Sequence, residues 1–285
     1  MKRKLYNELG FTDDYMFCKI LSSNLDLCKE LLELILGVEI KSVQLSESQR
    51  EMRETYTGKG IRLDVYVLGE DNVVYDIEMQ TTISKELPKR MRYYQGMIDI
   101  HLIERGDPYS KLKKSYIIFI CTEDTFGKGL PKYTFRNICE QDNSVVLDDE
   151  AEKIIINAGG NREGLSDNMK DFLDFIEGKG ATNSFTRRLQ EQVDTAIKED
   201  KWEVEYMTYI QTINLERAEA REEGFEEGRA EGRAVGREEG RAEGRAEGQR
   251  SLIESMLRKG KTPDEISDFC DYPLQLVKEI EKSMR

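Results

Sequence analysis

Two short stretches decide the fold class of this chain: IRLDVYV at residues 61–67 and VVYDIEMQ at residues 73–80. Successive side chains of a β-strand point to opposite faces of the sheet. The first stretch therefore places Asp64 on the face opposite to Leu63 and Val65. The second places Asp76, Glu78 and Gln80 opposite to its apolar residues. Turn-forming residues 69–72 lie between the two strands and predict a hairpin, which would bring Asp64 and Glu78 together on one sheet face.

Such a pair of acids suits a hard cation. Two close carboxylates repel each other and raise each other's proton affinity, and a divalent cation relieves this repulsion. Mg²⁺ favours one or two carboxylates together with water and phosphate oxygens. The pair therefore predicts a site for metal-assisted phosphodiester hydrolysis. The alternative is a solvated strand surface on which Asp64 and Glu78 have no chemical role.

Helical and strand-like patterns alternate around this hairpin. Apolar residues at helical spacing predict helices over 13–36, 85–104 and 167–177. Alternating or continuous apolar runs predict strands over 38–45, 61–68, 73–80, 114–122, 133–139 and 153–157, and Gly58–Gly60 predicts a turn. This order predicts an α/β fold in which helices flank a central mixed sheet.

Composition excludes several kinds of chemistry. The chain has 285 residues, a net charge of −13 and a single histidine, His101. A Ser-His-Asp or Cys-His site would depend on His101 alone, and an apolar helical stretch surrounds that residue. Chemistry must therefore use carboxylates, Lys, Tyr or a metal.

The five cysteines form no CxxC pair, and we interpret them as small core residues. The acidic balance disfavours tight nonspecific DNA binding but leaves a nuclease open, because a metal-filled carboxylate site attracts phosphate locally.

The chain lacks signs of a membrane or secreted protein. No apolar run approaches the roughly 20 residues that span a bilayer. Residues 1–5 are basic but lack the apolar core and the cleavage site of a signal peptide. We therefore expect no membrane partner and a cytoplasmic location.

At this point the sequence becomes recognisable. The segment 60–67, followed after 13 residues by Glu78-Met79-Gln80, resembles the PD-(D/E)XK nuclease superfamily, and more narrowly the bacterial recombination-promoting nuclease and transposase family. Segments 12–17, 87–94 and 115–122 fit the same family. The resemblance extends over roughly residues 10–215 and implies a restriction-endonuclease-like core with a C-terminal helical extension.

The resemblance also implies roles for individual residues. Asp64 and Glu78 would be metal ligands, with the backbone carbonyl of Met79 as a third, and the cofactor would be Mg²⁺ or Mn²⁺. Gln80 stands where the superfamily pattern usually has Lys, which orients the attacking water and offsets developing negative charge. Gln can orient water but carries no charge, so Asp64, Glu78 and Gln80 form the expected catalytic set.

Three further side chains are candidate substrate contacts. Asp14 lies where the first helix could lean into the site, or it is a helix-start carboxylate favoured by the helix dipole. Arg90 and Tyr94 are four residues apart on one helix face. They could contact phosphate, or they could be a salt-bridge partner and a core aromatic.

The C-terminal third is a different kind of sequence. Glycine recurs every four residues from Gly224 to Gly248, in an approximate Glu-Gly-Arg-Ala unit. Seven glycines would cost an isolated helix about 7 kcal/mol relative to Ala. We therefore interpret the repeat as a flexible spacer or as a helix stabilised by self-association. A capping box at Thr262–Glu265 with Pro263 at the first helical position opens a helix in the tail.

We thus expect a nuclease-like domain over 1–178, a helical connector over 179–222, the repeat over 223–250, and a small helix-turn-helix-like module over 251–285. The leading functional interpretation is a metal-dependent DNA endonuclease linked to recombination, transposition or defence. The alternatives are an oligomeric assembly protein with a weak or inactive nuclease fold, and a nuclease that cuts RNA.

Overall fold

A computed structural model describes residues 4–45, 51–52, 60–70 and 72–284. The chain forms two compact units, residues 1–207 and residues 208–285. The hairpin that carries Asp64 and Glu78 lies in the first unit. The predicted domain boundaries at 178, 222 and 250 stay predictions.

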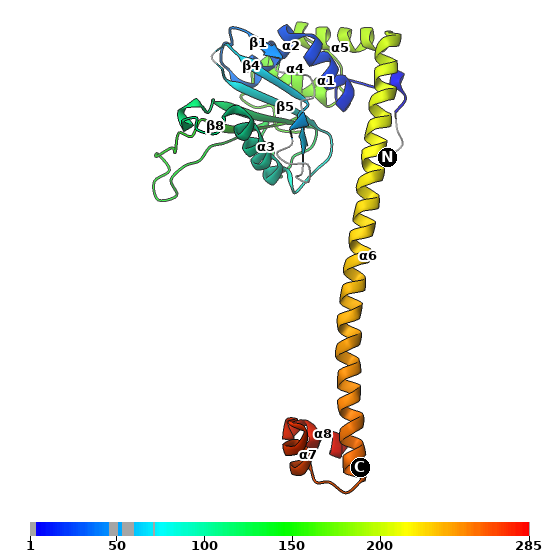
Figure 1. Ribbon diagram of the computed structural model, residues 1–285. Coiled ribbons are helices and arrows are strands. Elements are labelled where there is room, and N and C mark those ends of the chain that lie inside the picture. Colours follow the sequence, from blue (N-terminus) through cyan, green and yellow to red (C-terminus); the bar gives the residue numbers. More distant parts are fainter. Residues whose placement is uncertain (1–3, 46–50, 53–59, 71, 285) are drawn as a thin grey trace. The chain divides into compact units, whose positions relative to one another are not determined.

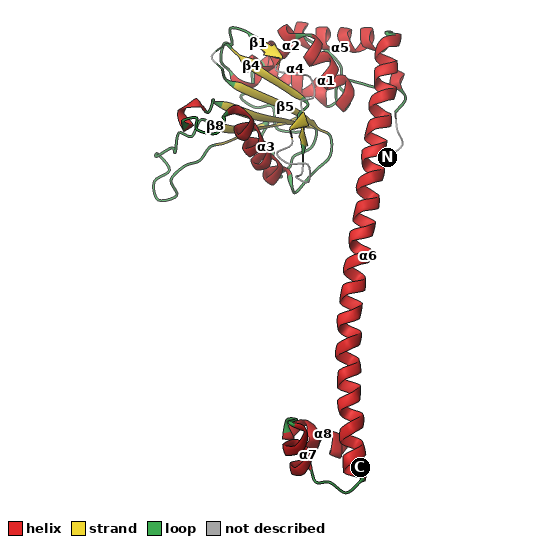
Figure 2. Ribbon diagram, in the orientation of Figure 1, coloured by secondary structure: helices red, strands yellow, loops and turns green. Residues whose placement is uncertain are grey.

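A six-stranded mixed sheet forms the centre of the first unit (Figure 2). Its order is β1 (Val43–Leu45), β4 (Val65–Gly69), β5 (Val74–Gln80), β6 (Ser115–Cys121), β8 (Ala151–Asn157) and β7 (Lys132–Phe135). The strands β5, β6 and β8 are parallel neighbours, and the other pairs are antiparallel. A separate pair joins β2 (Glu51–Met52) to β3 (Ile61–Arg62). The predicted mixed sheet is confirmed.

Helices cover both faces of this sheet (Figure 1). The helix α3 (Leu87–Leu102) lies on one face, where its apolar residues pack on Tyr66, Val74 and Phe119. The helices α1 (Asp14–Ser23), α2 (Leu25–Leu36), α4 (Asp167–Ile176) and α5 (Ser184–Ala196) lie on the other side. The continuous apolar run of β6 fits this arrangement, because a central parallel strand is buried on both faces.

Some predicted elements differ from the structure. The helix predicted over 13–36 is two helices, because Asn24 leaves helical geometry and its side-chain amide donates to the Ile20 carbonyl at 3.0 Å. The strand predicted over 38–45 keeps only Val43–Leu45, and the strand over 133–139 ends at Phe135. The strand predicted over 61–68 is interrupted at Leu63 and Asp64. The predicted turn at 58–60 falls largely outside the described residues.

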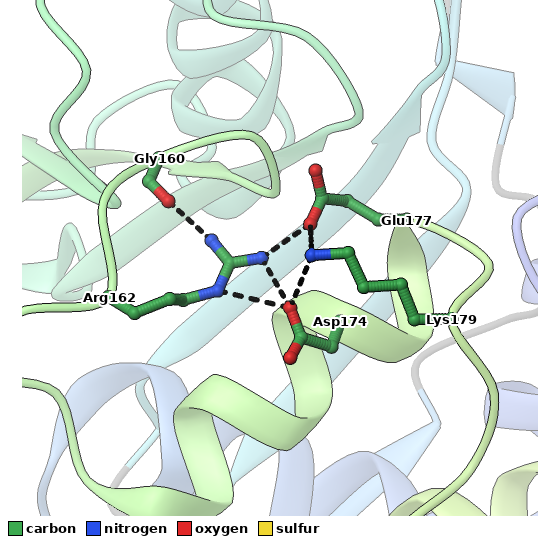
Figure 3. Close-up of polar contacts among 5 residues, drawn as sticks. All are labelled: Gly160, Arg162, Asp174, Glu177 and Lys179. Atoms are coloured by element: carbon green, nitrogen blue, oxygen red, sulfur yellow. Dashed lines mark hydrogen bonds and ion pairs between the residues drawn. The ribbon is translucent and has the colours of Figure 1, made fainter.

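A cluster of charged side chains ties the loop after β8 to the end of α4 (Figure 3). The guanidinium of Arg162 donates to Asp174 at 2.8 Å and to Glu177 at 2.6 Å, and also to the Gly160 carbonyl. The ammonium of Lys179 reaches the same two carboxylates at 3.0 and 2.8 Å. Both cations neutralise both acids, so the cluster fixes the loop without leaving net charge.

The second unit is wholly helical. It contains most of α6 (Asp200–Arg258), together with α7 (Pro263–Cys270) and α8 (Leu274–Ser283). A small core of Ile253, Ile266, Val277 and Ile280 joins the end of α6 to the two short helices. The predicted capping box is present: the Thr262 hydroxyl accepts from the backbone N–H of Glu265, and the Glu265 carboxylate accepts from the backbone N–H of Thr262. Within the described residues, no helix is both long enough and apolar enough to cross a bilayer.

Candidate metal centre

Strand pairing places Asp64 directly across from Glu78. Val65 of β4 pairs with Ile77 of β5 in antiparallel register, so the next position outward aligns Asp64 with Glu78. Asp64 itself lies in a bend between β3 and β4. The expectation that it belongs to a continuous strand is therefore wrong, although its position opposite Glu78 is as expected.

Two reciprocal hydrogen bonds hold the acids together and explain the bend. The backbone N–H of Asp64 donates to the Glu78 carboxylate at 2.9 Å, and the backbone N–H of Met79 donates to the Asp64 carboxylate at 3.1 Å. These bonds from backbone N–H groups to carboxylates replace the next backbone–backbone hydrogen bonds of the β4–β5 ladder. The two carboxylates are consequently fixed at one point beside the sheet.

Helix α1 brings a third acid to the same place. Asp14 is its first residue, and Asp14, Cys18 and Asp64 each offer one ligand atom within 4.8 Å of the others. Asp14 thus lies close to Asp64 and also in the first turn of a helix, so both interpretations of this residue stay open, and a contact with substrate stays a prediction. Cys18 was not predicted at the site. The available signal was its spacing, because Cys18 lies four residues after Asp14 and so on the same face of α1.

Burial and like charge raise the pKa of both central acids. For Asp64 burial is the main cause, with repulsion from Glu78 and then Asp14 adding to it. For Glu78 burial again comes first, followed by repulsion from Asp76. Hydrogen bonds from the backbone at Asp64 and Met79 oppose these shifts. Ionisation of both acids is therefore costly unless a cation binds beside them.

The side-chain amide of Gln80 forms hydrogen bonds with neighbouring residues of the protein. Its side-chain NH₂ donates to the Thr82 carbonyl at 2.7 Å and to the Thr82 hydroxyl at 3.1 Å. Its carbonyl oxygen accepts a hydrogen bond from the guanidinium of Arg90 on α3. A cation, Arg90, therefore contacts position 80, and its guanidinium also lies 4.8 Å from the ring centroid of Phe119. Attraction from Arg90 lowers the pKa values of Asp76 and Glu78 against the larger effect of burial.

Tyr94 is a core aromatic close to the acids. It is buried, and its ring lies 6.1 Å from that of Phe119. Burial and the negative charge of Glu78 raise the pKa of its hydroxyl. The structure thus puts Tyr94 beside Arg90, whose guanidinium lies 5.9 Å from its ring centroid, with its aromatic ring enclosed.

Asp76 is the residue at this site whose importance the sequence analysis missed. It shares the strand face of Glu78 and Gln80, and this alternation was the available signal. It is fully buried, and burial followed by repulsion from Asp64 raises its pKa. Neither of its carboxylate oxygens accepts a hydrogen bond from the described part of the chain.

The single histidine, His101, is not in the group of Asp14, Cys18 and Asp64, and Cys18 is the one cysteine in that group. His101 is an exposed residue of α3, and its Nδ1 lies 2.7 Å from the Met97 carbonyl. Cys18, Cys28 and Cys121 are buried, as expected for core residues, whereas Cys139 and Cys270 are only partly buried.

The sequence model of the PD-(D/E)XK nuclease family transposases matches residues 11–222. The chain belongs to this family. The match covers the whole sheet, α1 to α5 and the start of α6. No curated protein and no solved structure matches the chain. Membership supports a nuclease or transposase-like function and, with the mixed sheet, a PD-(D/E)XK nuclease fold.

Proposed function

We propose that this family member is a divalent-metal-dependent endonuclease that hydrolyses DNA phosphodiester bonds. The observation that carries the proposal is the reciprocal clamp of Asp64 and Glu78, which holds two carboxylates together at high local charge. Mg²⁺ or Mn²⁺ fits such a donor set, because all of its acidic groups are oxygen ligands.

The proposed ligands are Asp64, Glu78 and the backbone carbonyl of Met79. The N–H of Met79 points toward Asp64, and the N–H and C=O of one strand residue point toward the same side. The carbonyl of Met79 therefore faces the site as well. A bound cation would polarise the phosphoryl group and activate water. Asp14 would orient water or substrate from the α1 side.

The role usually filled by Lys at position 80 is divided in this chain. Gln80 holds Arg90, and Arg90 supplies the positive charge. A fixed guanidinium that faces a developing phosphorane stabilises negative charge in the transition state. Tyr94 supports the Arg90 guanidinium through its ring and is proposed to position this arginine instead of contacting phosphate itself.

Local charge favours nucleic acid beside the site, despite the net charge of −13. Residues 85–92, at the start of α3, include Lys85, Lys89, Arg90 and Arg92 but only one acid, Glu86. The side chains of Lys85, Lys89 and Arg92 are exposed. Phosphates could contact them while the scissile bond lies at Asp64 and Glu78.

Cleavage of supercoiled plasmid in the presence of Mg²⁺ or Mn²⁺ tests this proposal. We expect nicked and linear products from the wild-type chain and at least a roughly hundredfold loss in Asp64→Asn. Asp99→Asn is the matched control, because Asp99 is a partly buried acid on α3 that bonds to Gln95 outside the site. Equal cleavage by wild type and Asp64→Asn would exclude catalysis by this site. Single-stranded RNA in parallel reactions distinguishes an RNA-cutting enzyme.

A specific feature also favours the alternative of oligomeric assembly. The repeat in α6 is helical and exposed, and a Cβ added at any of its glycines would meet no atom within 4 Å. An isolated helix with this composition is intrinsically weak. We therefore propose that α6 self-associates through the repeat. Light scattering on the full chain and on a chain truncated before Glu223 tests this, and an unchanged oligomer in the truncated chain would refute it.

A further inference from the structure

Asp76 is a buried acid without a hydrogen-bond donor. It lies in the middle of β5, opposite Tyr66 on one side and Ile117 on the other. Its side chain is fully buried, and neither carboxylate oxygen has a partner among the described residues. Burial of an ionised carboxylate without compensation is strongly unfavourable. A partner other than the described residues must satisfy this group, or the group must carry a proton.

The charged groups around Asp76 are poor hydrogen-bond donors to its carboxylate. The Asp76 carboxyl lies within hydrogen-bonding reach of the Glu78 carboxyl, which is itself an acceptor unless one of the two is protonated. Arg90 attracts both acids, but its guanidinium hydrogen bond goes to Gln80, and its Nε is likewise buried without a partner. The guanidinium of Arg90 therefore attracts two carboxylates, those of Asp76 and Glu78, beside which Asp64 and Asp14 add further negative charge.

A divalent cation would correct this imbalance. Its two positive charges would offset negative charge that Arg90 alone leaves uncompensated among Asp14, Asp64, Asp76 and Glu78. The cation would also give the oxygens of Asp76 the partner that they lack. The unpaired state of Asp76 therefore has a functional explanation, namely that the fold preserves an incomplete acidic site for an ion.

We propose that Asp76 is a carboxylate ligand of the divalent cation, so that Asp64, Asp76 and Glu78 form one three-acid site. The inference rests on the proposed metal-dependent function and extends its ligand set inward along β5. Asp76 would then determine how tightly the cation is held, independently of cleavage.

Calorimetric titration of the full chain with Mn²⁺ alone tests this inference without any nuclease assay. Asp76→Asn keeps the shape of the side chain and removes its charge. We expect Mn²⁺ affinity to fall about tenfold or more in Asp76→Asn, whereas the control Asp99→Asn binds as the wild type does. We also expect metal-free Asp76→Asn to melt at or above the wild-type temperature, because it no longer buries an unpaired carboxylate.

Each outcome decides between explanations. Wild-type Mn²⁺ affinity in Asp76→Asn overturns the inference, and so does a lower melting temperature of the metal-free variant, which would show that Asp76 serves the fold. If wild type and Asp64→Asn bind Mn²⁺ equally, the proposed metal site itself fails. Loss of binding in Asp64→Asn but not in Asp76→Asn rejects only the role of Asp76.

Discussion

At the scale of single residues, the site separates two roles that one side chain often combines. Gln80 occupies the position of the usual Lys but carries no charge, and Arg90 comes to it from the next helix. A position that departs from a family pattern can therefore be compensated by a residue ten positions away in sequence. The sequence indicates Arg90 as a candidate phosphate contact on α3 but not as a partner of Gln80. Its contact with Gln80 depends on how α3 packs on the sheet.

This division predicts the effect of moving the charge. Arg90→Gln should lower kcat by about 10²–10³, as loss of one group that stabilises the transition state typically does. Gln80→Lys in the Arg90→Gln background should restore part of the loss, because it returns a cation to the position usual in the superfamily. Steady-state cleavage of a labelled duplex measures both variants. A second substitution that restores nothing would show that Arg90 acts in another way.

The charged cluster of Arg162, Asp174, Glu177 and Lys179 predicts a pH effect on stability (Figure 3). The hydrogen bonds from Arg162 and then Lys179 lower the pKa of Asp174. A lowered folded-state pKa stabilises the protein above the unfolded value of about 4, and the contribution is lost as pH falls through the folded value.

Asp174→Asn should therefore destabilise the chain by roughly 1 kcal/mol at neutral pH, a small value because solvent screens these partly exposed groups. Its melting curve should approach that of the wild type in acid. A melting series from pH 3 to pH 7 measures this, with Lys170→Met as a control for a nearby exposed pair. A destabilisation that persists unchanged at pH 3 would argue against a charge effect.

At the scale of elements, hydrophobic periodicity predicted the strands and helices whose position is set by burial of an apolar face. The strands β5, β6 and β8 and the helices α3 and α4 lie within three residues of their expected bounds, since their apolar patterns match the faces that they bury. The pattern could not predict local competition by polar side chains. Asn24 divides one predicted helix, and Asp64 interrupts one predicted strand by accepting the N–H of Met79.

The candidate site shows the same limit. Strand alternation and the family resemblance gave Asp64, Glu78 and Gln80, because these residues lie close along the hairpin. Three other features depend on the packing of α1 and α3. They are the hydrogen bond between Arg90 and Gln80, the position of Cys18 beside Asp64, and the lack of a hydrogen-bond partner for Asp76 among the described residues. Such tertiary contacts leave no periodic signal in the sequence.

The repeat in α6 predicts a direction of self-association. Glu precedes glycine at six of the seven repeat positions, and Arg follows glycine at five. Neighbouring residues are about 100° apart around a helix, so the glycine stripe has Glu on one flank and Arg on the other. In a parallel two-fold pair, opposite flanks face each other, whereas an antiparallel pair sets like flanks together. The charges therefore favour a parallel pair.

Spin labels at Ala230→Cys and, separately, Ala246→Cys measure the orientation, with Cys139 and Cys270 changed to Ser. A parallel pair gives short label-to-label distances at both positions, whereas an antiparallel pair gives a long distance for at least one of them. Replacing all seven glycines by Ala should raise helix content yet weaken association, because the added methyl groups prevent close approach along the four-residue ridge. Association that strengthens in the Ala variant would contradict contact through the glycine stripe.

At the scale of the whole molecule, folding and metal binding are linked through the same acids. The family match ends at residue 222, so the acidic site and the repeat belong to different parts of the chain and can be measured separately. The site must form against the repulsion of its own carboxylates. The fold tolerates this because the surrounding sheet and α3 bury an extensive apolar core, which offsets a local cost of a few kcal/mol.

This linkage predicts that stabilisation by Mn²⁺ increases with pH. The pKa values of Asp64 and Glu78 are raised in the folded chain, mainly by burial. Without a cation, their contribution to stability is therefore lost as pH rises from the unfolded value of about 4 through the folded value.

Mn²⁺ needs the deprotonated carboxylates and competes with protons for them. At a concentration near 100 times its Kd, Mn²⁺ should add about 2.7 kcal/mol, and this gain should shrink in acid. Melting temperatures from pH 5 to pH 8, with and without Mn²⁺, measure the gain, and Asp64→Asn subtracts the effect of all other titrating groups. A gain that is independent of pH, or equal in Asp64→Asn, would show that Mn²⁺ binds elsewhere.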